Sequence, residues 1–352
     1  MAIAPLPTRD LLGVFKDNRL ATVSNYWRTV GGLAVHQSTR PEIIFEKITS
    51  SRRIAPHVLP ANTGKPTLVK QGSAAQMFSP GYIKAKDPVL PGEQFSRQPG
   101  DLFTDVPRTP QANFDMAVAD VVAYHRQIIE RRWEYMAAKA VITGTVDVEY
   151  VDSPKVTVDF GRAAGHTIDA TASQWAAADT DLLENIESWA DTMATADFGG
   201  IANRLTVSPE VWAVMRKNTG IINEMSTQRR GNTETNIRTG ITVIDPNNMT
   251  KYVGTVGAGI DVYVTADFYQ NNAGSQVKYL PAKSAVLTAP GIDAVMAFGA
   301  IVDADANLQA SPVFMKMWKE NDPSAMFIMS QSAPLYIPVN PNCSMLIENL
   351  VA

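Results

Sequence analysis

A single cysteine, Cys343, stands among the 352 residues, so no disulfide can form within one chain. No apolar run approaches the roughly 20 residues of a membrane-spanning helix, and the start of the chain lacks the basic and apolar stretches of a secretory signal. We therefore expect no membrane partner. Charged residues make up only 19% of the chain, below the usual quarter. This low fraction indicates a surface that is partly buried against partners.

The sequence also lacks the residue patterns of catalytic, cofactor and metal sites. The four histidines are scattered and form no zinc-ligand set, and no nucleophile elbow or phosphate-binding glycine loop occurs. Residues 303–307, DADAN, begin like a calcium loop, but Leu308 and Phe314 stand where that loop needs glycine and glutamate. We therefore predict that the chain has no catalytic residue, cofactor or metal. For residues 303–307 we predict a turn with solvated carboxylates. His125 falls on a predicted helix, which favours a core or interface position.

Charge and proline are distributed unevenly along the chain. Residues 1–110 hold 14 Lys/Arg against 8 Asp/Glu and 12 of the 22 prolines, whereas residues 111–352 hold 17 Lys/Arg against 27 Asp/Glu. A basic front and an acidic body could attract each other within one chain or between copies. The alternative is ordinary drift in surface composition.

The proline-rich front predicts an irregular arm followed by a long two-stranded ribbon. Residues 42–48 and 67–72 have the β-branched and aromatic content of strands between turn signals. Three apolar residues follow among prolines and glycines: Tyr82, Ile83 and Leu90. Such residues are unusual in a free linker, and two strands alone are marginally stable in water. We therefore expect another surface to cover this segment.

The rest of the chain predicts an α+β fold. Apolar residues at three- and four-residue spacing between Pro110 and Gly144 predict one helix of some 30 residues, which would span about 45 Å. Two shorter helices follow, the second beginning after a predicted N-cap at Ser208. Short strands are expected over 241–302 and long strands over 311–352.

Four stretches occur in an order that is typical of one protein family. They are FSPGYIKAKDPV (78–89), STQRRGNTE (226–234), IVDADANLQ (301–309) and FIMSQSAPLYIP (327–338). Together with the order of arm, extended loop, long helix, mixed region and terminal strands, they resemble the tailed-phage major capsid proteins with the Hong Kong 97-type fold. The resemblance is to the lambda-type major capsid protein family in particular, and it is faint over residues 1–40.

The resemblance implies a Hong Kong 97-type fold in six parts. These are an N-terminal arm (1–40), an extended loop (41–106), a peripheral domain with the spine helix (107–175), an axial domain (176–305), long strands of the peripheral domain (306–338) and a C-terminal strand that returns to the axial domain (339–352). The extended loop would lie over a neighbouring subunit. Another copy, and not the same chain, would then cover Tyr82, Ile83 and Leu90.

The resemblance also implies contacts at the turn of residues 319–325, between the two long strands. In the family this turn sits where three capsomers meet. Lys319, Glu320 and Asp322 would then face the same turn in symmetry-related copies, where oppositely charged neighbours relieve the crowding of like charges. An ordinary solvated hairpin turn is the alternative.

The implied function is that of a major capsid protein, which self-assembles into pentamers and hexamers and forms the icosahedral shell around a double-stranded DNA genome. The implied partners are further copies of the chain, a separate scaffolding protein, a decoration protein, the portal and the packaged DNA. The scaffold is expected to be separate because the spine helix starts near residue 112, which leaves no room for an internal one. The implied location is the virion capsid, after assembly in the host cytoplasm.

Two alternatives remain open at this point. One is an encapsulin-like compartment shell of the same fold. The other is an enzyme whose site is dispersed in the sequence, which would have a deep polar pocket in a small oligomer.

Overall fold

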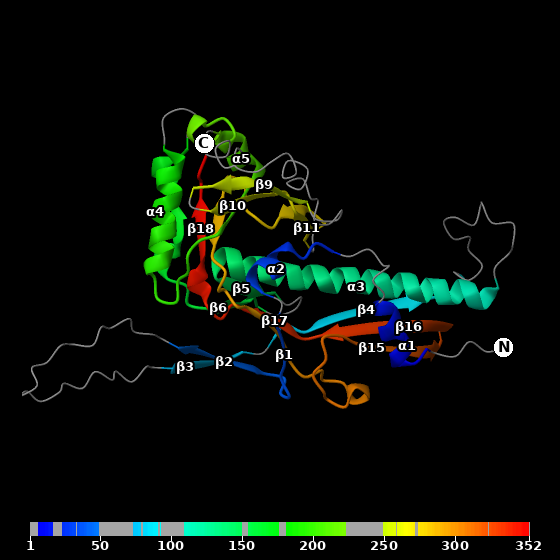
Figure 1. The fold of residues 1–352 in the computed structure, drawn as a ribbon. Coiled ribbons are helices and arrows are strands. Elements are labelled where there is room, and N and C mark those ends of the chain that lie inside the picture. The colour runs from blue at the N-terminus through cyan, green and yellow to red at the C-terminus, as the bar shows by residue number, and fades with distance from the viewer. Residues whose placement is uncertain are drawn as a thin grey trace, which may run out of the picture.

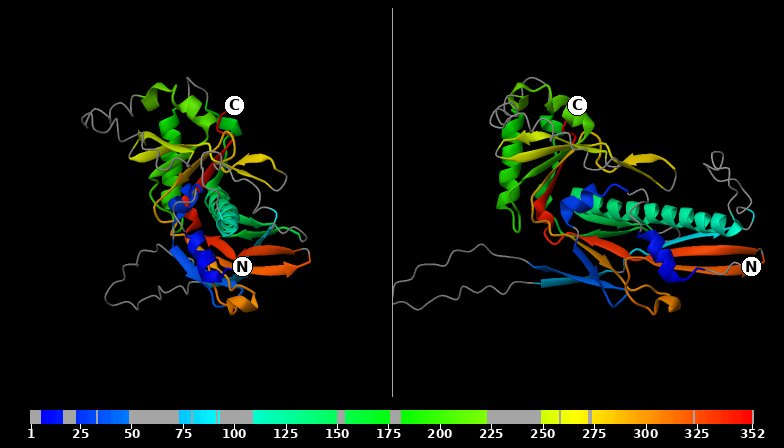
Figure 2. Two further views of the ribbon diagram at one scale, coloured as in Figure 1. Left: turned by 90° about the vertical axis from the view of Figure 1, so that its right-hand side faces the viewer. Right: turned by 45° about the vertical axis from the view of Figure 1, so that its right-hand side comes forward.

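The computed structural model describes most of the chain. The described residues are 6–16, 23–32, 34–48, 73–78, 80–90, 92, 109–149, 154–175, 181–222, 249–257, 259–271, 274–322 and 324–351. The molecule has two parts on either side of one long helix, α3 (Pro110–Thr143) (Figure 1). One part holds a six-stranded sheet, and the other holds a sheet of long strands. A two-stranded ribbon projects beside the second part (Figures 1 and 2).

The ends of α3 are fixed by the residues that the sequence suggested. The Thr109 hydroxyl accepts a hydrogen bond from the Ala112 amide at 3.3 Å, and Pro110 occupies the first turn. At the other end Gly144 adopts a left-handed conformation, with φ of 72°, and its amide bonds to Ala140 O. At about 1.5 Å per residue the helix is about 50 Å long. The predicted spine helix is therefore confirmed.

The long-strand sheet lies along one side of α3. Its strands are, in order, β15 (Phe314–Asn321), β16 (Ser324–Ser332) and β4 (Ile83–Val89), and both pairs are antiparallel. Helix α1 (Thr8–Phe15) packs against β15 and α3. One core cluster takes a buried side chain from each of these elements: Leu11, Phe114, Met315, Ile328 and Val89.

The six-stranded sheet lies on the opposite side of α3. Its strands are, in order, β7 (Thr167–Asp169), β18 (Ser344–Glu348), β13 (Ala285–Thr288), β8 (Arg204–Val207), β10 (Ile260–Thr265) and β9 (Thr250–Val256). Helices α4 (Leu182–Thr195) and α5 (Pro209–Met215) accompany it, and the Ser208 hydroxyl caps α5. The last strand of the chain, β18, pairs with β13 and β7 inside this sheet.

The remaining elements are short and join the two parts. They are α2 (Tyr26–Gly31); the strands β1 (Ala34–Gln37), β14 (Val295–Phe298) and β17 (Pro334–Ile337); the pairs β2 (Ile43–Ile48) with β3 (Ser73–Phe78), β5 (Thr145–Val148) with β6 (Val156–Asp159) and β11 (Phe268–Gln270) with β12 (Gln276–Lys278); and 3-10 turns at Ala164–His166, Thr171–Ser173, Ala304–Ala306 and Pro341–Cys343. Strands β1, β14 and β17 form what we call the central sheet.

The front of the chain differs from its prediction in two ways. The arm is not irregular: it contains α1 and α2, and its Trp27 is fully buried within its own chain. The ribbon partner of β2 is β3, while the predicted strand at 67–72 lies outside the described residues. The segment after β3 was expected to stay in the extended loop, but it forms β4. Pro88 is accommodated because β4 is an edge strand, where a missing amide breaks no ladder.

The tail and the proposed domain ranges also need adjustment. Residues 327–338 do not form one strand, because the chain passes at Ala333 from β16 in the long-strand sheet to β17 in the central sheet. β7 belongs to the six-stranded sheet although its residues fall in the range 107–175. β14 belongs to the central sheet although it falls in 176–305. Crossing connections of this kind leave no mark in the local sequence, and the axial and peripheral ranges remain predictions.

Candidate assembly surfaces

The ribbon of β2 and β3 carries apolar side chains that nothing covers in the described part of the chain. Ile44 and Met77 are direct cross-strand neighbours, and they are 50% and 62% exposed. The nearby Val35, on β1, is 60% exposed. The base of the ribbon is anchored at Ile43, which is buried. An isolated ribbon buries too little surface for its own stability, so a paired apolar surface on it indicates a contact with another molecule.

Two of the three apolar residues predicted to need another copy are half-buried within their own chain. The Tyr82 hydroxyl donates to Gln331 Oε1 at 2.6 Å, and its ring packs on a small cluster around Ile301. Ile83 packs against the core between α3 and the long-strand sheet. Each residue is thus partly covered within its own chain, because Ile83 begins β4 and Tyr82 directly precedes it. Contact of their exposed parts with another copy remains a prediction. Leu90, just after β4, is 45% exposed, and its contact with a neighbour remains a prediction.

The predicted charged turn lies at the free end of the β15–β16 hairpin. Lys319 and Glu320 are in the last part of β15, Asp322 follows the strand, and all three are exposed. In both views this tip points away from the end of the molecule that bears the ribbon (Figures 1 and 2). The two candidate surfaces therefore lie at opposite ends of the subunit. Their contacts with other copies remain predictions.

A buried histidine ties α3 to the long-strand sheet. His125 is fully buried, with Nδ1 2.7 Å from Ser330 Oγ on β16 and Nε2 2.8 Å from Asp87 Oδ2 on β4. These are the residue types of a catalytic triad, but here the serine is buried and the aspartate is exposed, which is the opposite of what a triad needs. Ser330 is fully buried, whereas the Asp87 side chain is 45% exposed, and a nucleophilic serine must be reachable by substrate. The group thus joins three elements of the core, as favoured for His125.

The acidic turn at 303–307 is not merely solvated. Asp303 Oδ2 accepts from Gln331 Nε2 and pairs with Lys316 Nζ, both at 2.7 Å, and Lys316 also reaches Asp305 at 3.1 Å. Burial raises the pKa of the Asp303 carboxyl, but the hydrogen bonds from Lys316 and Gln331 outweigh it and leave the pKa below its ordinary value. This turn is therefore fastened to the long-strand sheet by charge, which corrects the expectation of solvated carboxylates.

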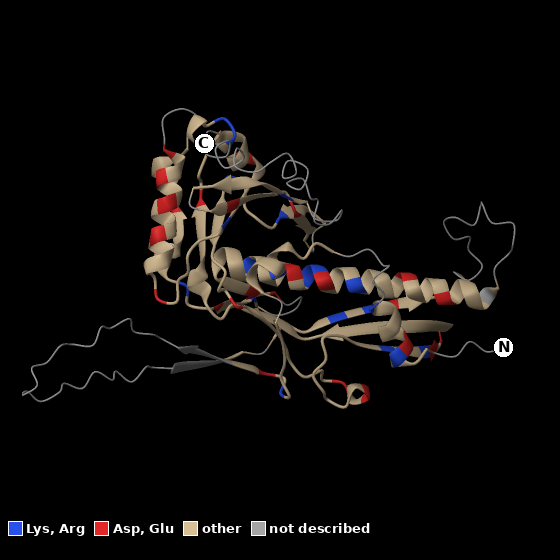
Figure 3. Ribbon diagram, viewed as in Figure 1, with Lys and Arg blue, Asp and Glu red and all other residues tan. Residues whose placement is uncertain are grey.

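Charge is segregated on the described surface. Exposed acidic side chains follow one another along α4 (Figure 3): Glu184, Glu187 and Asp191. Exposed basic side chains stand on β4 at Lys84 and Lys86. The predicted attraction between basic front and acidic body is realised within the chain at one point, where Arg28 Nε lies 3.1 Å from Glu134 Oε2.

The described residues contain no group of three or more His, Cys, Asp or Glu side chains that could hold a metal ion. No helix among them is long and apolar enough to cross a membrane.

Comparison with known proteins gives concordant results. The sequence model of the family described as Phage major capsid protein E matches residues 18–348. The major capsid protein of Escherichia phage N15 is 28% identical over 320 residues, which cover 86% of this chain and 87% of that protein. The major capsid protein of Escherichia phage lambda is 26% identical over 323 residues, covering 86% and 88%. A solved prophage capsid protein from Escherichia coli CFT073 superimposes with a TM-score of 0.73 over 99% of this chain and 100% of its own, at 18% identity, and so shows the fold alone.

Proposed function

The chain belongs to the phage major capsid protein E family, and from this premise we propose that its ribbon and its hairpin tip are the surfaces through which copies join into a shell. As a family member the chain is a major capsid protein with the Hong Kong 97-type fold. It is a structural protein of the virion and not an enzyme, as its relatives are head proteins. The resemblance of the four sequence stretches is thereby confirmed.

The finer picture follows from the family. Copies would form pentamers and hexamers that close into an icosahedral shell around double-stranded DNA, in the virion capsid and after assembly in the host cytoplasm. The family and the curated relatives are phage proteins, which favours this function over an encapsulin-like compartment. In this arrangement the six-stranded sheet would correspond to the axial domain, and α3 with the long-strand sheet to the peripheral domain.

The exposed apolar pair on the ribbon carries the proposal. Ile44 and Met77 lie side by side on two strands that have no layer behind them in the described chain. Permanent interfaces are large and resemble a protein core, so a neighbouring copy is the surface that would cover this pair. Because the ribbon of one copy would meet a different surface of the next, the contact is heterologous. Contacts of that kind generate rings when the rotation closes.

The other proposed partners rest on the family alone, and no contact in the described structure points to them. A separate scaffolding protein, a decoration protein and the portal remain part of the proposal. Packaged DNA would approach the shell without sequence recognition. The hairpin tip with Lys319, Glu320 and Asp322 would meet its counterparts in neighbouring capsomers.

The proposal is tested by adding charge to the ribbon. The double variant Ile44→Lys and Met77→Asp places opposite charges on facing positions of the two strands, which favours the backbone pairing. This charged pair does not fit an apolar interface, so the subunit should melt as the wild type does and fail to form shells. The double variant Ile44→Val and Met77→Leu is the matched control, because it keeps the apolar surface and should assemble. Circular dichroism melting and negative-stain electron microscopy provide the two readouts. Normal shells from the charged variant would overturn the ribbon's role.

A further inference from the structure

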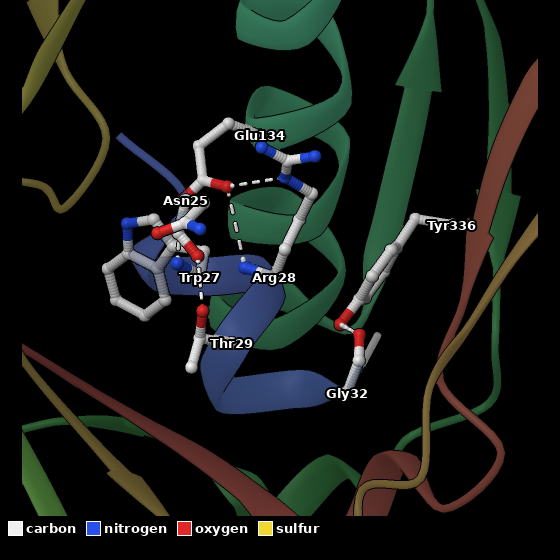
Figure 4. A network of polar contacts seen from close by, with 7 residues as sticks. All are labelled: Asn25, Trp27, Arg28, Thr29, Gly32, Glu134 and Tyr336. Atoms are coloured by element: carbon white, nitrogen blue, oxygen red, sulfur yellow. Dashed lines mark hydrogen bonds and ion pairs between the residues drawn. The ribbon is translucent and has the colours of Figure 1, made fainter. Parts of the chain in front are cut away.

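A buried carboxylate on α3 caps a helix that belongs to the arm (Figure 4). The Glu134 side chain is fully buried. Its Oε1 accepts from the Trp27 amide at 2.6 Å, and its Oε2 accepts from Arg28 Nε at 3.1 Å and from the Arg28 amide at 3.4 Å. The N-cap residue of α2, Asn25, makes no side-chain capping bond. Glu134 thus supplies from another element the acceptors that the first amides of a helix require.

The capped segment is held at both sheets that meet around α3. On the side of the six-stranded sheet, the hydroxyls of Tyr26 and Thr206 on β8 are 2.7 Å apart. On the side of the central sheet, the Tyr336 hydroxyl donates to Gly32 O at 3.3 Å. The chain then continues into β1, which pairs in parallel with β14. The described residues of the range 26–37, which are 26–32 and 34–37, therefore bridge the seam between the two sheets, and Glu134 holds the start of that bridge.

Close packing constrains the backbone at the end of α2. A side chain at Gly31 would collide with the Tyr336 hydroxyl, and one at Gly32 would approach Ala294 O to 2.9 Å. Ala294 N also donates to Gly31 O at 2.8 Å. The segment is held at its far end by backbone contacts, and at its near end by Glu134 and by the hydroxyl pair of Tyr26 and Thr206. Among these anchors, Glu134 is the side chain that can change its charge near neutral pH.

We propose that Glu134 is the positioning residue that clamps residues 26–37 of the arm across the seam between the six-stranded and the central sheet, and that its charge sets how firmly the clamp holds. The clamp is a property of the single subunit. The proposal for Glu134 does not depend on whether the ribbon and the hairpin tip serve as assembly surfaces.

The groups that face Glu134 come from three elements. They are Arg28 on α2, Tyr336 on β17 and Tyr279 just after β12. Burial is the main cause that raises the pKa of both tyrosines, and the neighbouring carboxylate raises them further, so both hydroxyls stay neutral near pH 7. Burial also raises the pKa of Glu134 to about 7, although Arg28 and the two amides oppose the shift.

The raised pKa fixes the direction of the pH effect. In a subunit with a released arm, Glu134 would regain contact with water and its ordinary pKa of 4.5. At a pH between about 4.5 and 7, Glu134 is therefore protonated in the clamped state and ionised in the released state. The clamp is firmest below the ordinary pKa and weakens as the pH rises through about 7.

Hydrogen exchange with mass spectrometry on the full chain tests the clamp. In Glu134→Ala we expect the amides of residues 26–37 to exchange at least about tenfold faster, because three donors lose their acceptor. Glu130→Ala is the matched control: Glu130 lies one turn earlier on α3, and its ion pair, at 2.9 Å, is with Arg126 of the same helix. Unchanged arm exchange in a folded Glu134→Ala would overturn the proposal.

The pH profile tests the role of charge and does not depend on that variant folding. After correction for intrinsic exchange rates, arm amides of the wild type should open roughly 30-fold more often at pH 8 than at pH 5.5, from the pKa values of about 7 and 4.5. Glu134→Gln keeps one acceptor oxygen without a titratable charge, so its arm exchange should not vary with pH. A flat wild-type profile, or a Glu134→Gln profile that still varies, would overturn the assignment.

Discussion

Replacing residues 49–72 by a two-residue Asn-Gly turn should separate folding from assembly. Ile48 and Ser73, which flank the replaced stretch, are the last cross-strand pair of the ribbon. A two-residue turn of this sequence joins paired strands at that point without strain. The change removes none of the described core, so we expect the subunit to fold. Closed shells should not form, because we propose that the ribbon needs its full length to bind a neighbouring copy.

Shortening the connection roughly twelvefold lowers the entropic cost of closing the ribbon by about 2 kcal/mol. Against that gain, no buried apolar surface of the described chain is lost. The free energy of unfolding should therefore stay the same or rise slightly. The contrasting variant is Val89→Ala on β4, where the side chain is 1% exposed in the core under α3. That change should lower the free energy of unfolding by about 2 kcal/mol.

Urea unfolding followed by circular dichroism measures the first effect, and electron microscopy of assembly reactions measures the second. The account predicts a stable ribbon variant without shells and a less stable Val89→Ala that still builds them. A ribbon variant that unfolds would show that residues 49–72 belong to the subunit's own core. A ribbon variant that still builds normal shells would show that the outer ribbon takes no part in assembly.

Three further predictions concern the core and the hairpin tip. His125→Ala should lower the free energy of unfolding by about 3 kcal/mol, because it leaves Ser330 buried without its partner and opens a cavity; thermal melting checks this against His36→Ala on exposed β1, which should be neutral. Trp27→Ala should cost about 4 kcal/mol in urea unfolding, since the ring is fully buried, and a cost near zero would contradict the packing of the arm on its own chain. Lys319→Glu at the hairpin tip should leave the melting temperature unchanged but lower the yield of shells in electron micrographs, whereas Lys251→Glu on β9 is an equally exposed control that should assemble.

The sequence predicted the elements whose signals are local. Pro110 and Gly144 mark the ends of α3, and Ser208 caps α5, because caps and helix breakers act within one turn. The α+β class and the long terminal strands followed from the same kind of evidence.

Features that depend on residues far away in the sequence could not be predicted from local patterns. The prolines around Ile83 suggested chain outside any sheet, but an edge strand tolerates Pro88. The cap of α2 comes from Glu134, which lies more than 100 residues away, and the partners of His125 come from β4 and β16. The helical stripe placed His125 in the core without indicating what it binds. The burial of Glu134, which only the structure shows, is the sign of the clamp. An ionisable side chain without exposure needs partners.

The most direct test of the account is an electron cryomicroscopy map of assembled particles at a resolution that shows side chains. We expect a closed shell in which Ile44 and Met77 of each ribbon are buried against another copy of the chain. A map in which the ribbon folds back on its own subunit, or in which both side chains face solvent, would contradict it.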